Sequence, residues 1–242
     1  MPLGFYILHE DEACLVVAKP GGLLTQAPLG IDSLEVRIKK FLRERDGIEG
    51  DVYLGVPHRL DRPVSGVIVF AKHRKAARKI SDQFEQRRVE KTYWALAQGV
   101  VQPTSGTWTD YLKKVEGDPR SVVTDESDPE GQRAVLHYIV VKQVSEPCPS
   151  TLLEITLETG RTHQIRIQCA SRGYALLGDE MYRSNAYHFG PPTDDERQRM
   201  VALHARSLSF WNPVSSAVMT FVAPLPEYWP QMDVTPPEPS RD

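Results

Sequence analysis

The chain has 242 residues, of which 40% are hydrophobic and 25% are charged, and its formal net charge is −3. This composition is typical of a soluble globular protein, and the small net charge provides no overall basic field for a nucleic acid. Three cysteines lie far apart without a CxxC pair, which indicates a reducing compartment and excludes a disulfide framework and a cysteine-based zinc site. We expect no signal peptide, and no apolar run of the sequence reaches the about 20 residues of a membrane span. We therefore expect a cytoplasmic protein.

Apolar runs and turn residues predict the elements of the first half of the chain. Leu15–Ala18 predicts a strand that ends in a turn at Lys19-Pro20-Gly21-Gly22. Apolar residues at helical spacing then predict a helix that Ser33 caps and Gly47 ends. The next expected elements are a buried strand, a charged helix and a further strand, over residues 66–72, 74–91 and 92–99.

The second half is richer in strands. The polar segment 113–133 predicts an exposed loop or hairpin, and 159–173 predicts a change from strand to helix that ends at Gly173. We expect an antiparallel pair of strands over residues 134–144 and 151–158, followed by a loop over 189–199. A closing hairpin is expected over 205–213 and 217–226, and a disordered tail over 231–242. Strands outnumber helices and rarely alternate with them. The predicted fold class is α+β, with a mixed, largely antiparallel central sheet flanked by helices.

The stretch HRLDRPVSGVIVFAK places Asp61 between Arg59 and Arg62, directly before the buried strand. A structural ion pair within the turn would explain this pattern, since surface ion pairs are common. However, Pro63 and Gly66 specify a tight turn on rigid, buried structure, and loops held in this way often carry function. Neighbouring cations favour the ionised form of a carboxylate. That form suits a nucleophile better than a general acid.

A second polar cluster, GRTHQIRIQ, contains Arg161, His163 and Arg166. One interpretation is a solvated basic helix entry in which the histidine is structural. Arg166 stands between two isoleucines in a stretch that must pack, so its charge needs a partner, and Asp61 is a candidate. Tyr93 begins an apolar strand and would by itself be interpreted as a core residue.

Positive charge is concentrated in one segment. Residues 72–91 contain eight lysines and arginines and three acids, a local net charge of +5 in a chain whose total is −3. Such segregation is the local signature of a polyanionic partner, although a solvated helix face would also account for it. The segment RIKKFLRER is a second, weaker basic region.

Three ordered stretches, HRLDRPVSGVIVFAK, EKTYWALAQG and GRTHQIRIQCASRGYALLGDEMY, together resemble the RluA-type pseudouridine synthases. LVVAKPGGLLTQ resembles the first motif of that family, and the likeness extends from about Phe5 to Trp229. The resemblance implies a catalytic domain over residues 1–230, with a catalytic cleft across its sheet. It also implies a chain that begins directly with this domain, without the small N-terminal RNA-binding domain of many relatives.

The resemblance also implies a role for each matched position. Asp61 matches the essential catalytic aspartate, and Arg166 matches the arginine that forms a salt bridge with it. Tyr93 matches the tyrosine that stacks on the target base and removes the proton from base carbon 5. The positions implied to hold the RNA, with phosphate or structural contacts for the last two, are Arg59, Arg62, Arg161 and His163. Val64 departs from the family pattern, because many relatives have threonine there, and this leaves the catalytic set intact.

These observations predict an RNA pseudouridine synthase that isomerises specific uridines in structured ribosomal or transfer RNA. The chain has no ligand-spaced metal cluster, phosphate loop or dinucleotide motif, so we expect no cofactor, no metal and no membrane partner, and a monomer. A glycoside hydrolase would need a second carboxylate, and no motif distinguishes one. An RNA-binding module without catalysis would explain the basic helix without using Asp61.

Overall fold

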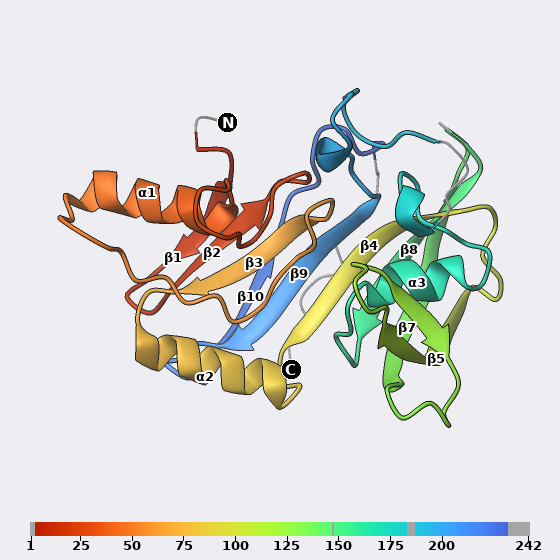
Figure 1. Cartoon of the computed structure of the whole chain (residues 1–242), viewed down its shortest axis with the longest axis horizontal. Helices are drawn as coiled ribbons and strands as arrows, with labels where there is room; N and C mark the ends of the chain where they lie inside the picture. Colours follow the sequence, from red (N-terminus) through yellow and green to blue (C-terminus); the bar gives the residue numbers. More distant parts are fainter. Residues whose placement is uncertain (1–2, 147, 183–186, 232–242) are drawn as a thin grey trace.

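The computed structural model describes residues 3–146, 148–182 and 187–231. Within these ranges ten strands form one sheet, in the order β1-β2-β3-β9-β4-β8-β7-β5-β6, with β10 paired to β9 (Figure 1). The neighbouring strands pair in antiparallel fashion, apart from the parallel contact between β3 and β9. The α+β class and the largely antiparallel sheet predicted from the sequence are confirmed.

The strands of the sheet are β1 (Tyr6–Glu10), β2 (Cys14–Lys19), β3 (Ser65–Ala71), β4 (Glu90–Gln98), β5 (Ser105–Lys114), β6 (Ser121–Thr124), β7 (Gln132–Val144), β8 (Ser150–Leu157), β9 (Leu203–Trp211) and β10 (Val218–Val222). The helices are α1 (Leu34–Asp46), α2 (Arg74–Glu85) and α3 (Gln164–Ala170), with 3-10 turns at Glu180–Tyr182 and Glu196–Gln198. In Figure 1, α1 lies beside β1 and β2, and α2 lies along the opposite edge of that half. Helix α3 packs against β5 and β6.

Two predicted elements need correction. The charged helix expected over 74–91 ends at Glu85, because Arg87 adopts a left-handed backbone with φ of 55° and Glu90 already pairs with Ser209 of β9. The segment expected as a loop or hairpin is a hairpin, and its first strand begins earlier, at Ser105. Tertiary pairing decides both boundaries, and a polar run carries no periodicity from which such pairing can be predicted.

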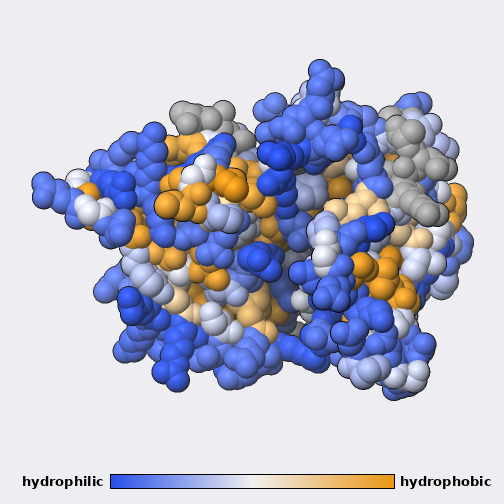
Figure 2. Space-filling view, viewed as in Figure 1, coloured by the Kyte–Doolittle hydropathy of each residue, from blue (hydrophilic) through white to orange (hydrophobic). Residues whose placement is uncertain are grey.

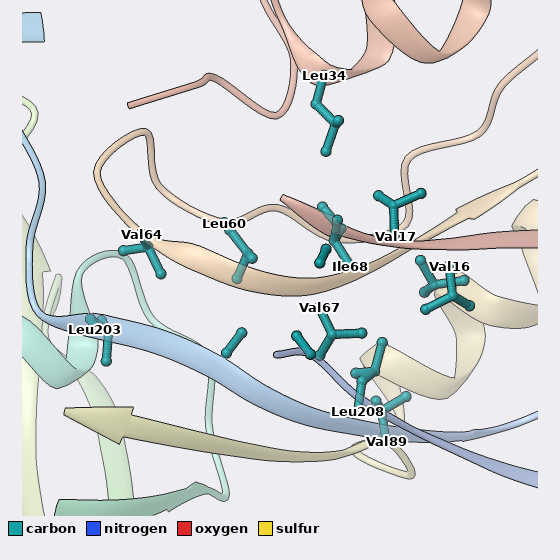
Figure 3. Close-up of a cluster of buried hydrophobic side chains, with 14 of the residues drawn as sticks. Val16, Val17, Leu34, Leu60, Val64, Val67, Ile68, Val89, Leu203 and Leu208 are labelled. Carbon is teal, nitrogen blue, oxygen red and sulfur yellow. The ribbon is translucent and has the colours of Figure 1, made fainter. Parts of the chain in front are cut away.

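The loop that carries Asp61 is built into the hydrophobic core. Leu60 and Val64, on either side of it, are buried in the same cluster as the β2 and β3 side chains, for example Val17 and Ile68 (Figure 3). Burial of two aliphatic side chains contributes roughly 1.5–3 kcal/mol each. The loop is therefore held at both ends while its central residues are partly exposed.

Gly66 allows β3 to meet β9 directly after this loop. The parallel contact consists of Ser65 with His204 and Gly66 with Ala205. A Cβ atom at position 66 would lie 2.3 Å from the carbonyl oxygen of Ala205, and the backbone φ of +124° is one that other residues rarely adopt. The Ser65 hydroxyl lies 2.9 Å from Nδ1 of the buried His204. This close approach joins the two halves of the sheet beneath the Asp61 loop.

All three cysteines are buried and unpaired. Over the ranges that the structure covers, no helix has the length and apolar character needed to cross a bilayer. The disorder expected for the tail concerns residues 232–242, which lie outside the described residues.

Candidate active site

A cleft of about 1340 Å³ opens where the Asp61 loop faces the segment that leads into α3. Figure 2 shows a hollow near the centre of this face of the molecule. The end of α2, the start of β4 and the tip of the β5–β6 hairpin complete its wall. Of the described residues, nine lysines and arginines and six aspartates and glutamates line the cleft. The cleft therefore carries a positive excess in a chain whose net charge is negative.

Asp61 lies on a rigid loop. Thr25 Oγ1 donates to the carbonyl of Leu60 at 2.8 Å and accepts from its N–H at 3.1 Å. The buried Lys19 ammonium donates to the carbonyl of Arg62 at 3.2 Å, and burial lowers the pKa of Lys19 to about 7. The Asp61 side chain is 36% exposed. The loop thus presents one carboxylate to the cleft from a fixed backbone.

The structure brings Arg166 and His163 to this carboxylate. Arg166 Nη1 and His163 Nε2 each lie 3.6 Å from Asp61 Oδ2. His163 adopts a left-handed backbone, with φ of 55°, at the start of α3, and burial lowers the pKa of its imidazole. A non-glycine residue in this conformation carries strain, which proteins retain mainly at functional sites.

Arg166 has a stronger partner that the sequence did not single out. Its Nε and Nη2 donate to the two carboxylate oxygens of Asp179 at 2.6 and 2.7 Å. The side chains of Arg166 and Asp179 are 4% and 1% exposed. A bidentate pair of this kind fixes the plane of the guanidinium, so that Nη1 points toward Asp61.

Tyr182 connects the same groups from the other side. Its hydroxyl lies 3.0 Å from Nδ1 of His163 and accepts from the N–H of Ser121 at 2.8 Å. The Arg166 guanidinium lies 5.2 Å from the centre of the Tyr182 ring. Tyr182 therefore orients both residues that approach Asp61.

Tyr93, which the sequence left open as a core residue, lies at the wall of the cleft and is only partly buried. Its position on β4 is fixed by pairing with Ile155 of β8 and Ala205 of β9. Burial and the negative charge of Asp61 together raise the pKa of the Tyr93 phenol. The phenol is therefore neutral in the free protein at neutral pH.

The remaining predicted residues also line the cleft but form no ion pair with Asp61 among the described residues. Arg59 is exposed, Arg62 is partly buried, and Arg161 Nε donates to the carbonyl of Arg133 at 3.1 Å. Among the described residues, neither Arg59 nor Arg62 forms an ion pair with Asp61, so the alternative of a structural ion pair within the turn is wrong. These arginines remain available to a ligand.

Three residues of the site were not assigned from the sequence: Lys19, Asp179 and Tyr182. Each had a signal in the sequence. Lys19 ends an apolar run and is followed by Pro-Gly-Gly. Asp179 and Tyr182 come after the apolar residues Ala175–Leu177 and stand three residues apart. A single sequence does not show which such residues face inward.

One group of possible metal ligands in the described structure lies away from the cleft, at the β1–β2 turn. Side-chain atoms of His9, Asp11 and Cys14 lie within 4.8 Å of one another. The Asp11 carboxylate accepts from the N–H groups of Ala13 and Cys14 and from Asn212 Nδ2, which accounts for its position as a turn residue. The expectation that the protein needs no metal stays a prediction.

The fold and the site define an enzyme that places a fixed carboxylate in a cationic cleft, and comparison with known proteins specifies its family. Residues 13–171 match the family model described as RNA pseudouridylate synthase. Ribosomal large subunit pseudouridine synthase D of Zymomonas mobilis is 34% identical over 91% of this chain and 69% of its own length. An uncharacterized RNA pseudouridine synthase of Synechocystis is 30% identical over 93% of this chain and 67% of its own length.

A solved structure agrees with these matches. The human RNA pseudouridylate synthase domain containing 4 superposes with a TM-score of 0.72 at 26% identity, over 92% of this chain and 89% of that one. The chain belongs to the RNA pseudouridylate synthase family, and it is an isomerase that acts on RNA. The family membership predicted from the sequence is confirmed, and the glycoside hydrolase and the non-catalytic RNA-binding module are not supported.

Proposed function

We propose that Asp61 is the catalytic residue and that it acts at the ribose of a uridine held in the cleft. The observation that carries this proposal is the position of its carboxylate, fixed by the loop and 3.6 Å from both Arg166 and His163. In the reaction the bond from N1 to ribose C1′ breaks and a bond from C5 to C1′ forms. One proton leaves C5 and one is taken up at N1, so the reaction needs no net electron, water or phosphate.

A carboxylate suits the sugar end of this reaction. Positive charge develops at C1′ as the glycosidic bond breaks, and a preorganised anion stabilises such charge. Asp61 then either bonds to C1′ or stabilises the sugar while the base turns. In both cases Arg166, held by Asp179, keeps the carboxylate in place while the charge on the sugar changes.

Tyr93 is the residue that we assign to the proton on C5. In the free enzyme its phenol is neutral because burial and the charge of Asp61 raise its pKa. When the reaction at the sugar neutralises Asp61, the electrostatic part of that increase disappears. The pKa of Tyr93 then falls, so the phenol can give its own proton to N1, which must take one up, and the phenolate that remains accepts the proton from C5.

Arg59, Arg62 and Arg161 serve in binding. The target uridine must leave its stack to reach Asp61, which costs a few kcal/mol, and contacts between these cations and phosphates offset that cost. The relative from Zymomonas is named for the ribosomal large subunit. We therefore propose structured ribosomal RNA as the first substrate to test and transfer RNA as the second.

We further propose that residues 1–230 form the catalytic domain, and that it works as a monomer in the cytoplasm without a metal or cofactor. The ten-stranded sheet of the described residues, which ends with Val222, supports this domain assignment. Activity that a chelator abolishes and one specific metal ion restores would contradict the metal-free mechanism.

The test of the catalytic assignment is Asp61→Asn, which keeps the size of the side chain and removes its charge. Pseudouridine formation on ribosomal RNA should fall below detection, while the affinity for the same RNA at fixed salt should be unchanged or slightly tighter. Asp51→Asn, a matched change at a fully exposed position, should retain both properties. Near-normal turnover by Asp61→Asn would refute the assignment. Pseudouridine mapping across all RNAs, with and without the gene, would identify the target.

A further inference from the structure

Helix α2 carries its charges in an arrangement that opposes its own stability. Its exposed face bears Arg74, Lys75, Arg78 and Lys79, while the opposite face packs on β3 and β9. Arg74 and Arg78 stand four residues apart, as do Lys75 and Lys79, and like charges at this spacing destabilise a helix. Neutral or alternating residues at these surface positions would have been more favourable for folding.

The helix dipole adds to this cost. Arg74 and Lys75 stand in the first turn of α2, and that turn contains no acidic residue. The N-terminus of a helix carries partial positive charge, so cations there are unfavourable. The sequence of α2 thus places cations at the end of the helix where they are least favourable.

Helix α1 shows the opposite arrangement in the same protein. Glu35 stands in its first turn, and Arg43 and Arg45 stand in its last turn, which is the distribution that the helix dipole favours. Lys39 pairs with Glu35 at 2.6 Å, and Lys40 pairs with Glu44 at 3.8 Å, both at a spacing of four residues. Basic residues of α1, the second basic region of the sequence, are therefore paired with acidic residues of the protein itself.

Most cations of α2 have no such partner. Within the described part of the chain, no carboxylate lies within 4.0 Å of the charged groups of Arg74, Lys75 or Arg78, and Lys79 donates to the carbonyl of Pro213 at 2.6 Å. Arg74 is exposed and lies 5.9 Å from the centre of the Tyr53 ring. Residues that break a local rule without an internal compensation mark a functional surface.

The C-terminal end of α2 reaches the cleft, and the acidic residues Asp82 and Glu85 follow the four cations toward that end. Phe84 and Glu85, at the end of α2, and Arg87 just beyond it all line the cleft. The 12 residues of α2 extend about 18 Å away from that point. In Figure 1 the helix lies along the lower edge of the molecule, and Figure 2 shows a hydrophilic surface over the same edge.

We propose that the exposed face of α2, with Arg74, Lys75 and Arg78 at its centre, binds the phosphates of an RNA duplex that flanks the target uridine. This inference rests on the proposed entry of RNA into the cleft. A backbone that leaves the cleft beside Arg87 passes along α2, and each phosphate neutralised there releases counterions and increases affinity. The surface reads no base sequence. It extends the grip on the RNA beyond the nucleotide that reacts.

Lys75→Glu tests this proposal because RNA affinity and stability should change in opposite directions. An acid in the first turn, four residues before Lys79, is favourable for the helix, so the melting temperature should stay equal or rise. The probe is a uridine-containing RNA stem-loop with one further helical turn of duplex. Its affinity should fall by roughly five- to tenfold at 0.1 M salt. The slope of log affinity against log salt should decrease by about one.

Lys40→Glu on α1 is the control, because it makes the same change of charge at an exposed lysine. It should leave RNA affinity unchanged and lower stability slightly, because the new glutamate would repel Glu44. Arg78→Gln is a second α2 variant, which relieves the repulsion from Arg74 and should also weaken RNA binding. Unchanged affinity and salt slope in both α2 variants would overturn the proposal and favour a protein partner for this face. Equal losses in Lys75→Glu and Lys40→Glu would overturn it in favour of a net-charge effect.

The length of the RNA separates this inference from the proposed function. On the stem-loop without the added duplex, Lys75→Glu and the unaltered protein should bind with similar affinity. An equal loss on both probes would place the contact inside the cleft and overturn the extended surface. Asp61→Asn tests the catalytic assignment independently, since its result does not depend on α2.

Discussion

Arg166 and Asp179 form a bidentate ion pair inside the protein, with nitrogen–oxygen distances of 2.6 and 2.7 Å. This pair, rather than the looser contact with Asp61 at 3.6 Å, compensates the buried charge of the arginine. Asp61 is therefore not needed to stabilise the fold through Arg166. It receives an oriented nitrogen without having to neutralise a buried cation, and its charge can change during a reaction without loss of the fold.

The first prediction follows from this division of roles. Asp179→Asn leaves the charge of Arg166 buried and uncompensated, which should cost roughly 3–5 kcal/mol of unfolding free energy. Asp61→Asn should cost much less, because its side chain is 36% exposed. Urea unfolding of a double-mutant cycle with Arg166→Met measures both couplings. A coupling of Arg166 to Asp61 as large as that to Asp179 would contradict this prediction.

The second prediction concerns Tyr182. Tyr182→Phe removes a hydroxyl that accepts from the Ser121 N–H and contacts His163. An unsatisfied buried N–H costs about 1–3 kcal/mol, and the freed imidazole should lower the turnover number more than it raises KM. Tyr111→Phe removes an exposed hydroxyl bound to Glu126 and should change neither. Equal kinetics for the two variants would show that Tyr182 does not position the site.

The third prediction separates binding from proton transfer at Tyr93. Tyr93→Phe keeps the ring that can stack on a base but removes the group that accepts the C5 proton. Turnover should fall by at least about two orders of magnitude, with RNA affinity within about twofold of the unaltered protein. Quantifying pseudouridine in single-turnover reactions, alongside RNA binding, provides the comparison. Retained turnover would assign the proton to another group.

The fourth prediction is a loss of stability in mild acid. Burial lowers the pKa of His58 to about 3 and that of His204 to about 4. The unfolded chain binds protons at these residues near pH 6.5, whereas the folded protein does not. Stability should therefore fall as the pH decreases from about 6.5 toward 4, by up to about 1.4 kcal/mol per pH unit for each histidine.

A substitution can assign part of this slope. His58 Nε2 accepts from the N–H of Val69 at 3.1 Å and its ring stacks on Phe84 at 4.3 Å. His58→Gln retains an acceptor and should flatten the decline between pH 6.5 and 4.5, whereas His188→Gln at an exposed position should not. Carboxyl groups with strongly lowered pKa values, such as Glu10 with a pKa of about 2, lose their contribution to stability only below this pH range. An unchanged slope in His58→Gln would contradict this assignment.

The local parts of the fold and site were predictable from the sequence because they depend on near neighbours. Ser33 and Gly47 cap α1 as expected, with the Val36 N–H bound to the Ser33 side chain and φ of 62° at Gly47. The turn around Asp61 and its buried flanks follow from a few adjacent residues. The residues alone made Asp61 a candidate partner of Arg166, whereas the roles of Tyr93 and His163 depended on the family resemblance, since single-residue arguments left both as ordinary structural residues.

The unpredicted parts depend on distant neighbours. Asp179 lies 13 residues from its partner Arg166, and Tyr182 contacts Ser121, which is 61 residues away. The end of α2 is set by the pairing of β4 with β9, across more than a hundred residues. Propensity and periodicity describe a local window, so they cannot identify contacts of this kind.

The strand order also determines when this site can assemble during synthesis. Strand β9, which spans Leu203–Trp211, inserts between β3 and β4. Until it emerges from the ribosome, the edges of β3 and β4 that it will join have no partner in the sheet, and unpaired edges of this kind invite association with other chains. The Asp61 loop is translated early but gains its final support only when nearly the whole chain is available. We therefore expect nascent chains truncated before β9 to require chaperone protection and to lack activity.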